Sequence, residues 1–464
     1  MPENRSDKQK RGTDKCRGGI GMSKQAEHKV DLTRVPDDRR LFGTVSYMLM
    51  WWSSVIVIQG FMLGQSMLPP VGGLNIFQAL TAMVVASLTL AIFFSLNGSA
   101  GLKYGIPFAI HSRSSFGVKG SKIATLLRGV PALFWFGIAT WIGADAIAMV
   151  TQTMFGFGNT MVYFFIFQIL QVILAASGIQ SIKWFESSMA IIIVLIMGYM
   201  MISISQNFGD QLTANWTSAG SWGMPFITSV VALVGAVFTS SVNNSDLTRY
   251  LKNSQKVNWI GHLAGIPISN AFLVGLGIMS GAAVGEWDPV KALVKIAPNT
   301  ATAMLILIFI ALAQITTNLT MNVLPPALTL MDFVPKIGWK TSCVIVGVLG
   351  VVTCPWLLFN SQGFFGLINA YSAFLGPVLG VMLADYFFIR KQTLDIDELY
   401  KENNTKYRFT NGWNLAALIA VGIGGIFGII FNSLSWLVAM PIGLVVYMIL
   451  YPIIYKSHDA KVKA

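Results

Sequence analysis

Charged residues are scarce in this chain. They make up 11% of the 464 residues, whereas hydrophobic residues make up 54%. A soluble domain carries about 25% charged residues, so this chain has too little polar surface to cover a water-soluble globule of its size. The apolar residues form blocks of about 18 residues or more, the length that crosses a hydrocarbon core. The short alternating segments of a β-barrel are absent, so the composition predicts an all-α membrane protein.

Cysteines and catalytic signatures are also scarce. The three cysteines, Cys16, Cys343 and Cys354, form neither a disulfide framework nor a Cys-x-x-Cys metal pattern. No Walker loop, zinc-protease motif or catalytic triad occurs in a fitting context. We therefore expect no enzyme active site and no cofactor apart from a coupling ion. A channel is not favoured either, because no ring of charges or filter loop is recognisable.

Basic residues outnumber acidic ones and give a net charge of +12. They lie between the apolar blocks or at the chain ends, so we expect no nucleic-acid partner. With the N-terminus inside, every Lys and Arg except Lys291 and Lys295 falls on the inner side. We expect both termini in the cytoplasm and a multi-pass protein of the inner or plasma membrane. The expected spans, about twelve, lie at roughly 42–66, 74–96, 124–150, 159–178, 187–206, 224–243, 258–283, 301–322, 341–359, 364–388, 414–432 and 434–455.

Two spans are interrupted midway by small and polar residues. Span one contains Ser53-Ser54 and Gln59-Gly60, and span six contains Gly235 followed by Thr239-Ser240-Ser241. A broken helix at membrane depth leaves backbone groups that a ligand, water or ion must satisfy. Such a pair, five spans apart, indicates an inverted repeat of five plus five helices with a midplane site. The alternative is that small residues let the helices pack closely.

This repeat divides the chain into a core and its appendages. The polar N-terminal residues lack the apolar stretch of a signal peptide, and we expect them to form a disordered tail. The expected parts are a cytoplasmic tail at 1–40, a ten-helix core at 41–390 with repeats at about 41–206 and 224–390, a cytoplasmic loop at 391–413, two peripheral helices at 414–455, and a cytoplasmic tail at 456–464.

Polar side chains in span eight could bind an ion and a ligand. Thr316 and Thr317 offer two adjacent hydroxyl oxygens, and carbonyls freed by a break in span one could complete a sodium site. Alternatively, each hydroxyl bonds back to the preceding turn of its own helix. Asn322 follows within two turns, where its amide could read the donor and acceptor edge of a planar ligand.

Span three adds a carboxyl group and an aromatic platform. Asp145 is the only carboxylate deep inside a span, and a charged residue there is a functional candidate by default. It could carry a proton, or it could be a hydrogen-bonded carboxyl that bridges helices. Trp135 could stack on a flat ring or could serve ordinary packing.

At these residues the sequence resembles the nucleobase:cation symport-1 family, which includes cytosine, purine, uracil, allantoin and hydantoin permeases. The resemblance covers about residues 40–415. It is carried by Gly105-Ile106-Pro107-Phe108, Arg113-Ser114-Ser115-Phe116-Gly117-Val118-Lys119-Gly120, Leu133-Phe134-Trp135-Phe136-Gly137, Ile182-Lys183-Trp184-Phe185-Glu186, Asp246-Leu247-Thr248-Arg249, Leu375-Gly376-Pro377 and Ala384-Asp385-Tyr386-Phe387-Phe388-Ile389-Arg390-Lys391.

The resemblance implies the LeuT-like inverted-repeat fold of sodium-coupled amino-acid transporters and a mechanism of alternating access. It implies that Trp135 stacks on the substrate ring and that Asn322 hydrogen-bonds it. It also implies that the Thr316 and Thr317 hydroxyls and the Ala313 carbonyl bind sodium.

The chain departs from this family pattern at several positions. Ala139 stands where hydantoin and allantoin carriers have a Gln, and Val237, next to Phe238, stands where they have a second Trp. In span one, the residue equivalent to the family's amide is Ser53, Ser54 or Gln59. We expect a symporter that imports a small flat heterocycle, such as cytosine or a purine, coupled to sodium or to protons through Asp145. The alternative function is a cation-coupled amino-acid carrier of the same fold.

Overall fold

The computed structural model describes residues 32–54, 58–177, 195–334, 336–401 and 405–463. Regular structure in these ranges is helical, with only two isolated bridges between extended residues. The helices are η1 (Asp37–Arg39), α2 (Thr44–Ser54), α3 (Ile58–Gln65), α4 (Ile76–Tyr104), α5 (Phe108–Phe155), α6 (Thr160–Ala176), α8 (Gly209–Trp216), α9 (Met224–Ala236), α10 (Phe238–Val242), α11 (Ser245–Thr248), α12 (Gln255–Val284), α13 (Pro289–Ile296), α14 (Thr300–Thr317), η2 (Asn318–Val323), α15 (Leu324–Phe333), α16 (Trp339–Val352), α17 (Pro355–Leu358), α18 (Ser361–Leu383), η3 (Ala384–Ile389), α19 (Ile396–Tyr400), α20 (Leu415–Ile430), η4 (Asn432–Leu434) and α21 (Ser435–Lys463).

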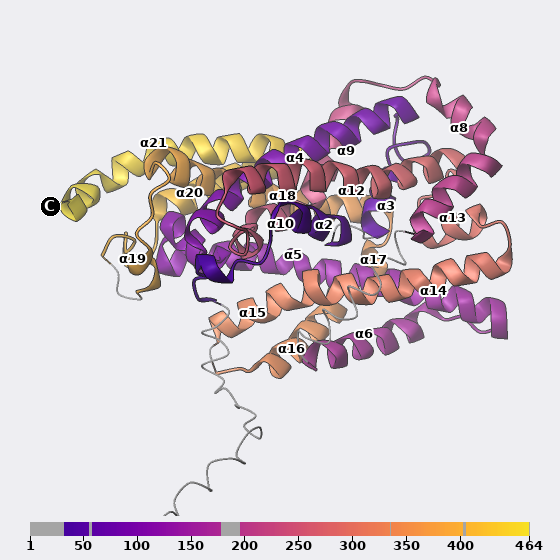
Figure 1. The fold of residues 1–464 in the computed structure, drawn as a ribbon, viewed down its shortest axis with the longest axis horizontal. Helices are drawn as coiled ribbons and strands as arrows, with labels where there is room; N and C mark the ends of the chain where they lie inside the picture. Colours follow the sequence, from indigo (N-terminus) through magenta and orange to yellow (C-terminus); the bar gives the residue numbers. More distant parts are fainter. Residues whose placement is uncertain (1–31, 55–57, 178–194, 335, 402–404, 464) are drawn as a thin grey trace, which may run out of the picture.

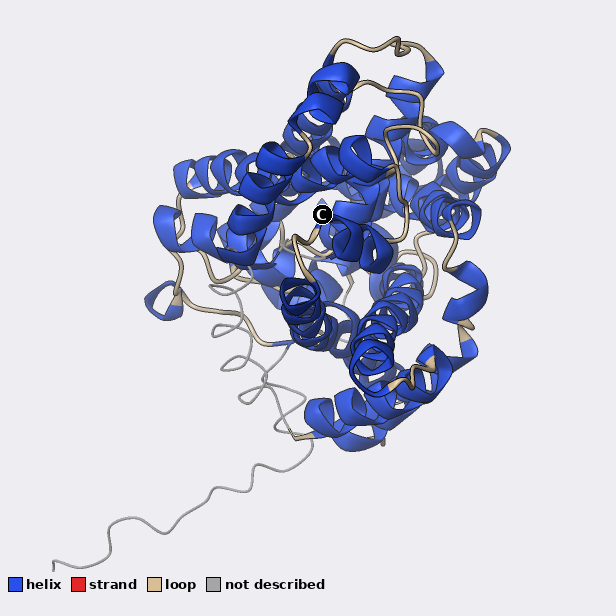
Figure 2. Cartoon of the chain, turned by 90° about the vertical axis from the view of Figure 1, so that its right-hand side faces the viewer, coloured by secondary structure: helices blue, strands red, loops and turns tan. Residues whose placement is uncertain are grey.

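The long helices form one elongated bundle. In Figure 1, α4, α5, α12 and α14 run along the longest axis, with α20 and α21 along one flank and α15 and α16 along the other. The short helices α8 and α13 lie at the end opposite α19 and the C-terminus. Figure 2 looks along this axis and shows the helices packed around one another.

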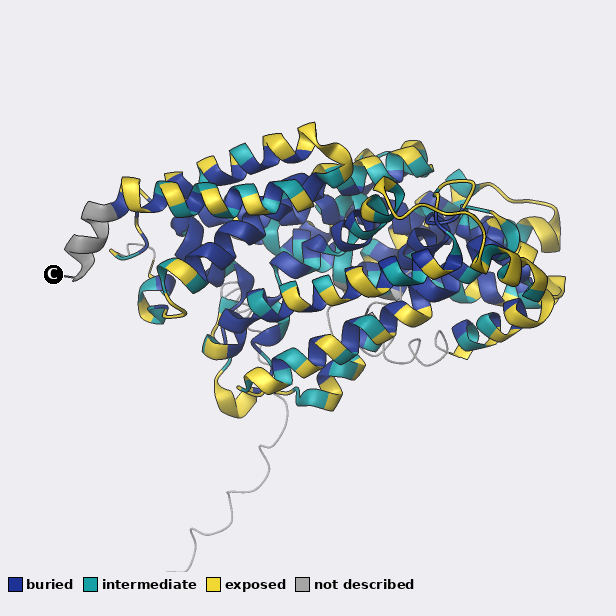
Figure 3. Cartoon of the chain, turned by 90° about the horizontal axis from the view of Figure 1, so that it is seen from above, coloured by how far each residue is buried: buried dark blue, intermediate teal, exposed yellow. Residues whose placement is uncertain are grey.

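Several helices have the length and composition of membrane spans. Five in the described ranges are long and apolar enough to cross a membrane, at 76–104, 108–155, 255–284, 361–389 and 432–455. Shorter apolar helices, including α6, α14 and α16, accompany them. Figure 3 shows exposed residues on the outer faces of the bundle, and many of them are large apolar side chains such as Ile92, Ile173 and Val348. The expected number of twelve spans remains a prediction, because the fifth lies partly outside the described residues.

Two helices extend beyond the expected spans at one end of the bundle. α4 continues to Tyr104 instead of ending near 96, and α5 begins at Phe108 instead of near 124. The turn between them needs Gly105, whose φ of +69° favours glycine, and Pro107, which precedes the first turn of α5. The charged residues between spans two and three therefore lie on helix and not in an open loop.

The interruption expected in span six occurs, whereas the middle of span one lies outside the described residues. Span one consists of α2 and α3, and the linking residues 55–57 lie outside the described residues. Span six leaves the α-helix at Val237, between α9 and α10. The Ala236 carbonyl at this break accepts a hydrogen bond of 3.1 Å from the Tyr371 hydroxyl of α18. A backbone group freed by the break is thus satisfied by a neighbouring helix.

Span eight contains an interruption that the sequence did not reveal. A π-helical turn, η2, separates α14 from α15, and the helix continues to Phe333 instead of ending near 322. Pro325 and Pro326 fall in the first turn of α15, where a missing N–H does least damage. The π turn therefore lets the chain pass two prolines without ending the span.

α20 and α21 are joined to the core by buried polar contacts. α5 kinks at Gly117, where φ is +79° and ψ is 168°. The Gly412 carbonyl accepts from the Lys119 N–H at 2.9 Å, and the Asn414 N–H donates to the Phe116 carbonyl at 2.9 Å. The residues just before α20 thus satisfy the backbone groups that the kink frees.

A buried ion pair lies beside this kink. The Asp385 carboxylate on η3 is fully buried and accepts from the Arg390 guanidinium at 3.0 Å. It also accepts from the Tyr447 hydroxyl of α21 at 2.8 Å and from the Ser115 hydroxyl of α5 at 3.2 Å. One carboxylate therefore links three helices at the same end of the bundle.

Close packing of glycines joins α3 to α12. A Cβ atom on Gly277 would overlap the Phe61 carbonyl oxygen, and one on Gly64 would overlap the Val274 carbonyl oxygen. The two backbones can approach this closely only because neither position carries a side chain. This contact sets the position of α3.

Candidate substrate site

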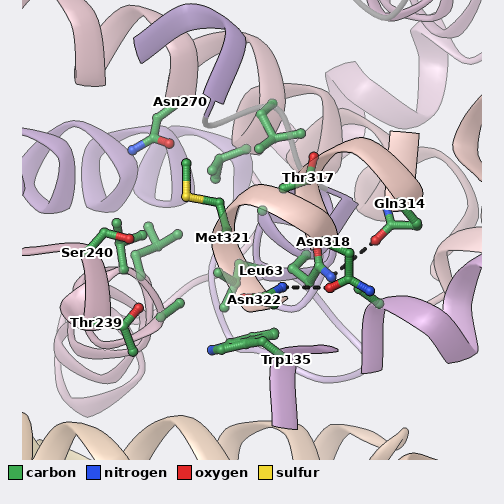
Figure 4. A pocket seen from close by; sticks show the side chains of 18 of the residues that line it. Leu63, Trp135, Thr239, Ser240, Asn270, Gln314, Thr317, Asn318, Met321 and Asn322 are labelled. Carbon is green, nitrogen blue, oxygen red and sulfur yellow. Dashed lines mark hydrogen bonds between the residues drawn. The ribbon is translucent and has the colours of Figure 1, made fainter. Parts of the chain in front are cut away.

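The interruptions in spans six and eight adjoin one cavity, which α2 and α3 of span one also line. Its volume is about 130 Å³, and Figure 4 shows its residues. Helices α2, α3, α5, α9, α10, α12 and α14 and the π turn η2 all contribute side chains. The lining residues are Trp51, Gln59, Gly60, Leu63, Trp135, Ala139, Leu233, Ala236, Val237, Thr239, Ser240, Asn270, Leu273, Val274, Gln314, Thr317, Asn318, Met321 and Asn322.

Trp135 forms one side of the cavity. Its ring meets Phe364 edge-on, with centroids 5.5 Å apart and an interplanar angle of 82°, and meets Tyr371 edge-on at 6.4 Å and 68°. Edge-on contacts from these two rings hold the indole in place. Figure 4 shows the flat indole lying across the cavity beside Asn322. The arrangement offers an aromatic surface to a flat ligand.

A cluster of amides lies next to the indole. The Asn322 side-chain nitrogen donates to the Asn318 oxygen at 2.8 Å, and both residues lie on η2. The Asn318 nitrogen donates to the Gln171 oxygen of α6 at 2.9 Å and to the Phe136 carbonyl of α5 at 3.1 Å. Asn318 is fully buried, whereas Asn322 is half-buried at the cavity wall. This cluster fixes the polar edge of the site.

Three further amides line the cavity. The Gln59 nitrogen of α3 donates to the Gln314 oxygen of α14 at 3.3 Å. The Asn270 nitrogen of α12 donates to the Ser87 hydroxyl of α4 at 3.0 Å. Hydroxyls of Thr239 and Ser240 from the end of span six are also present. A ligand would therefore meet one aromatic face and several hydrogen-bonding groups, as is typical of small-molecule sites.

The structure brings together most of the residues expected to bind the substrate. Trp135, Ala139, Val237, Gln59 and Asn322 all line the cavity. Where the sequence left the span-one residue open, Gln59 is the one described at the cavity. The side chain of Ser54 lies outside the described residues.

Phe238 lies elsewhere, contrary to its expected place beside the substrate. Its side chain is fully buried and packs against the rings of Phe93 and Trp436, with centroids 6.1 and 5.4 Å away. It is not among the residues that line the cavity. The break at Val237 starts a new helix, so two neighbouring side chains point to different sides.

The residues expected to bind an ion are only partly described. Thr317 lines the cavity, and Ala313 lies one turn earlier on α14 and is buried. The side chain of Thr316 lies outside the described residues, as do residues 55–57, whose carbonyls would approach from span one.

Asp145 does not line the cavity. It lies ten residues after Trp135 on α5, and its carboxylate accepts from the Thr160 hydroxyl of α6 at 2.8 Å. This contact matches the interpretation of Asp145 as a carboxyl that bridges two helices, and a proton-carrying role remains a prediction.

Sequence reasoning missed several cavity residues, above all Asn318, Gln314 and Asn270. Asn318 precedes Asn322 by four residues, which places both on one helix face. That spacing was a usable signal. Nothing in the sequence near Asn270 distinguished it from a packing residue in span seven.

Interrupted helices arranged around a small cavity define the architecture of a secondary carrier. The chain belongs to the family of permeases for cytosine/purines, uracil, thiamine and allantoin, whose family model matches residues 34–452. The allantoin permease of Bacillus subtilis is 29% identical over 459 residues, covering 90% of this chain and 92% of the relative. The chain is therefore a multi-pass membrane permease and not an enzyme.

Solved structures agree with this assignment. The inward-facing conformation of Mhp1 has a TM-score of 0.83 and 25% identity, covering 92% of this chain and 94% of that chain. Mhp1 in a closed conformation with bromovinylhydantoin bound, described as a nucleobase-cation-symport-1 family transporter, has a TM-score of 0.79 and 25% identity, covering 92% and 96%. The expected family and the all-α, LeuT-like fold are confirmed.

Proposed function

We propose that this permease is a symporter that imports a small, flat, neutral heterocycle together with a sodium ion. The observation that carries the proposal is the placement of the Trp135 indole and the Asn322 amide in one cavity of about 130 Å³. An aromatic face attracts a flat ring, and an amide beside it reads the hydrogen-bonding edge of that ring.

The substrate class follows from the size and lining of the cavity. A nucleobase or a related compound such as cytosine, a purine, allantoin or hydantoin is built on a small heterocycle with N–H donors and with N or O acceptors. Ala139 and Val237 line the cavity with apolar atoms. Their side chains contribute no polar contact, so recognition rests on the polar groups elsewhere in the lining, among them Gln59, Asn270 and Asn322.

Sodium is the preferred coupling ion. Thr317 lies at the cavity on α14, and Ala313 lies one turn away on the same helix. Sodium bound there would touch both α14 and the break in span one, and so would favour one arrangement of the two helices. Coupling then needs only that the ion and the substrate prefer the same conformation. The alternative is coupling to protons through Asp145, which lies away from the cavity.

The direction of transport follows from the orientation expected from the positive charges. With both termini in the cytoplasm, the end of the bundle that carries α19 and the C-terminus is the inner end. Uptake into the cell then proceeds toward this end, down the sodium gradient.

Transport by the purified protein in liposomes tests the proposal. Initial uptake of labelled cytosine, uracil, hypoxanthine, allantoin and hydantoin is measured with and without an inward sodium gradient, and amino acids are added as competitors. Uptake of at least one heterocycle, stimulated by sodium and unaffected by amino acids, is expected. Inhibition by amino acids, with no heterocycle transported, would overturn the substrate class in favour of an amino-acid carrier.

Variants separate the two coupling ions. Replacing both Thr316 and Thr317 with Ala should abolish the stimulation by sodium. The control is Thr329→Ala on α15, whose hydroxyl bonds to the Pro325 carbonyl of its own helix at 2.9 Å. If the double variant keeps its sodium stimulation, the assigned sodium site is wrong. If the wild type shows no sodium stimulation and Asp145→Asn loses uptake driven by a pH gradient, coupling occurs through protons instead.

A further inference from the structure

The hydrogen bonds of the amide cluster beside the cavity have a fixed donor-to-acceptor direction. The cluster starts at the Phe136 carbonyl on α5, which can only accept hydrogen bonds. The Thr140 hydroxyl donates to this carbonyl at 2.8 Å, and the side-chain nitrogen of Asn318 donates to it at 3.1 Å. A backbone carbonyl therefore determines which end of the Asn318 amide faces α5.

Gln171 on α6 independently requires the same orientation of the Asn318 amide. Its nitrogen donates to the Thr140 hydroxyl at 2.9 Å and to the Phe167 carbonyl at 3.4 Å. Its oxygen therefore faces Asn318 and accepts from the Asn318 nitrogen at 2.9 Å. A flipped Asn318 would place its oxygen against two acceptors, the Phe136 carbonyl and the Gln171 oxygen, deep in the protein where such contacts are costly.

The orientation of Asn318 in turn determines the orientation of Asn322 at the cavity wall. With its nitrogen engaged, Asn318 presents its oxygen to Asn322, whose nitrogen donates to it at 2.8 Å. The Asn322 oxygen can then accept a hydrogen bond from a ligand, beside the second N–H of the same amide. Figure 4 shows the Asn318 amide beside Asn322 and the Trp135 indole below Asn322.

The Asn270 amide, on the opposite wall of the cavity, is oriented in the same way. The Ser87 hydroxyl donates to the Met83 carbonyl at 2.6 Å, so its oxygen accepts from the Asn270 nitrogen at 3.0 Å. The Asn270 nitrogen therefore faces α4, and its oxygen is the end left for the cavity. Two amides on different helices thus offer acceptors to a ligand.

We infer that Asn318 is a positioning residue that holds the Asn322 oxygen toward the cavity, and that the carrier selects heterocycles that present a ring N–H to it. The inference rests on the proposed function, because it assumes that the heterocycle binds in this cavity. A site built to accept from an N–H rejects an analogue that lacks this group, because the buried oxygen is then left unpaired. We expect a preference of about 30-fold or more for the N–H compound.

Matched ligand pairs test this selectivity. Hydantoin and succinimide differ by replacement of one ring N–H with CH₂, and uracil is compared with 1-methyluracil and 3-methyluracil. Dissociation constants are measured by competition against the best-bound labelled heterocycle in the purified permease. In the wild type, loss of one particular N–H should weaken binding about 30-fold or more.

Substitutions at Asn318 and Gln171 separate a positioning role from a purely structural one. In Asn318→Ala the parent compound should bind about tenfold more weakly, while the analogue without the N–H changes by less than about threefold. Gln171→Ala should reduce the ratio of the two dissociation constants, analogue over parent compound, by a smaller amount, since the Phe136 carbonyl still orients Asn318.

Gln168→Ala is the matched control. Gln168 lies one turn before Gln171 on the same helix and is also buried, but its nitrogen donates to the Gly347 carbonyl of α16 at 2.7 Å. It should lower the melting temperature without changing the ligand ratio.

The outcomes distinguish the inference from the proposed function. If Asn318→Ala weakens the parent and the analogue equally, or if the wild type binds both alike, the inference is wrong although the transporter assignment stands. If no heterocycle binds the wild type at all, the proposed function itself fails.

Discussion

The contact between α3 and α12 allows a sharp test of how the cavity is positioned. In Gly277→Ala, the new methyl group would overlap the Phe61 carbonyl oxygen and lie 2.9 Å from the Phe61 carbonyl carbon and 3.0 Å from its Cα. Carbon atoms prefer separations of about 3.5–4.0 Å, so α3 must move away by roughly 1 Å. Overpacking of this kind costs about 1–3 kcal/mol of stability.

The same displacement should reduce transport. α3 carries Gln59 and Leu63, which line the cavity opposite other helices. A shift of roughly 1 Å in a positioned group can lower activity by about 100-fold, so we expect at least a tenfold loss of uptake. The measurements are initial uptake in liposomes and the melting temperature in detergent.

Gly275 supplies the matched control on the same helix. No described atom lies within 4 Å of a Cβ built on Gly275, and alanine is favoured over glycine inside a helix by about 0.5–1 kcal/mol. Gly275→Ala should therefore keep wild-type uptake and melt at the same temperature or slightly higher. Wild-type behaviour of Gly277→Ala, or equal damage from both substitutions, would refute the packing argument.

Four further predictions concern the Trp135 platform, two buried polar contacts and one surface ion pair. Trp135→Ala should weaken heterocycle binding about tenfold and Trp135→Phe less, by competition binding, because a stacking ring contributes about 0.5–1.5 kcal/mol beyond its burial. Asp385→Asn should cost about 3–5 kcal/mol by leaving Arg390 buried without its counter-ion. Glu398→Gln, in the pair with Lys401 whose side chain is 61% exposed, should lower the melting temperature far less than Asp385→Asn. Asn97→Ala should lower the melting temperature, since its amide donates to two carbonyls at the end of α10, one of them at 2.8 Å.

The break in span six could be predicted because its cause is local. Gly235 and the hydroxyl residues that follow it weaken a helix wherever they occur, and the structure leaves the helix at Val237. The π turn at 318–323 was not predictable in the same way. Its buried Asn318 bonds to α5 and α6, partners that no local pattern reveals.

Part of the candidate site could also be predicted from the sequence. Trp135 and Asn322 stood out by residue type and by resemblance to a family, and both line the cavity. Val237 and Phe238 could not be separated from the sequence, because the direction of each side chain depends on where the new helix begins. Asn318 was overlooked because its role depends on Gln171, which is distant in the sequence.

The sequence by itself determined that this chain is helical and belongs in a membrane. Each span partitions into lipid through the sum of its own side chains, and the positive charges between spans bias the orientation, so both properties follow from local composition. Only the tertiary structure decided which polar atoms face the cavity. The amide of Asn322 has two chemically different ends, and its direction is set by Asn318, Gln171 and the Phe136 carbonyl, three partners that approach from separate parts of the chain.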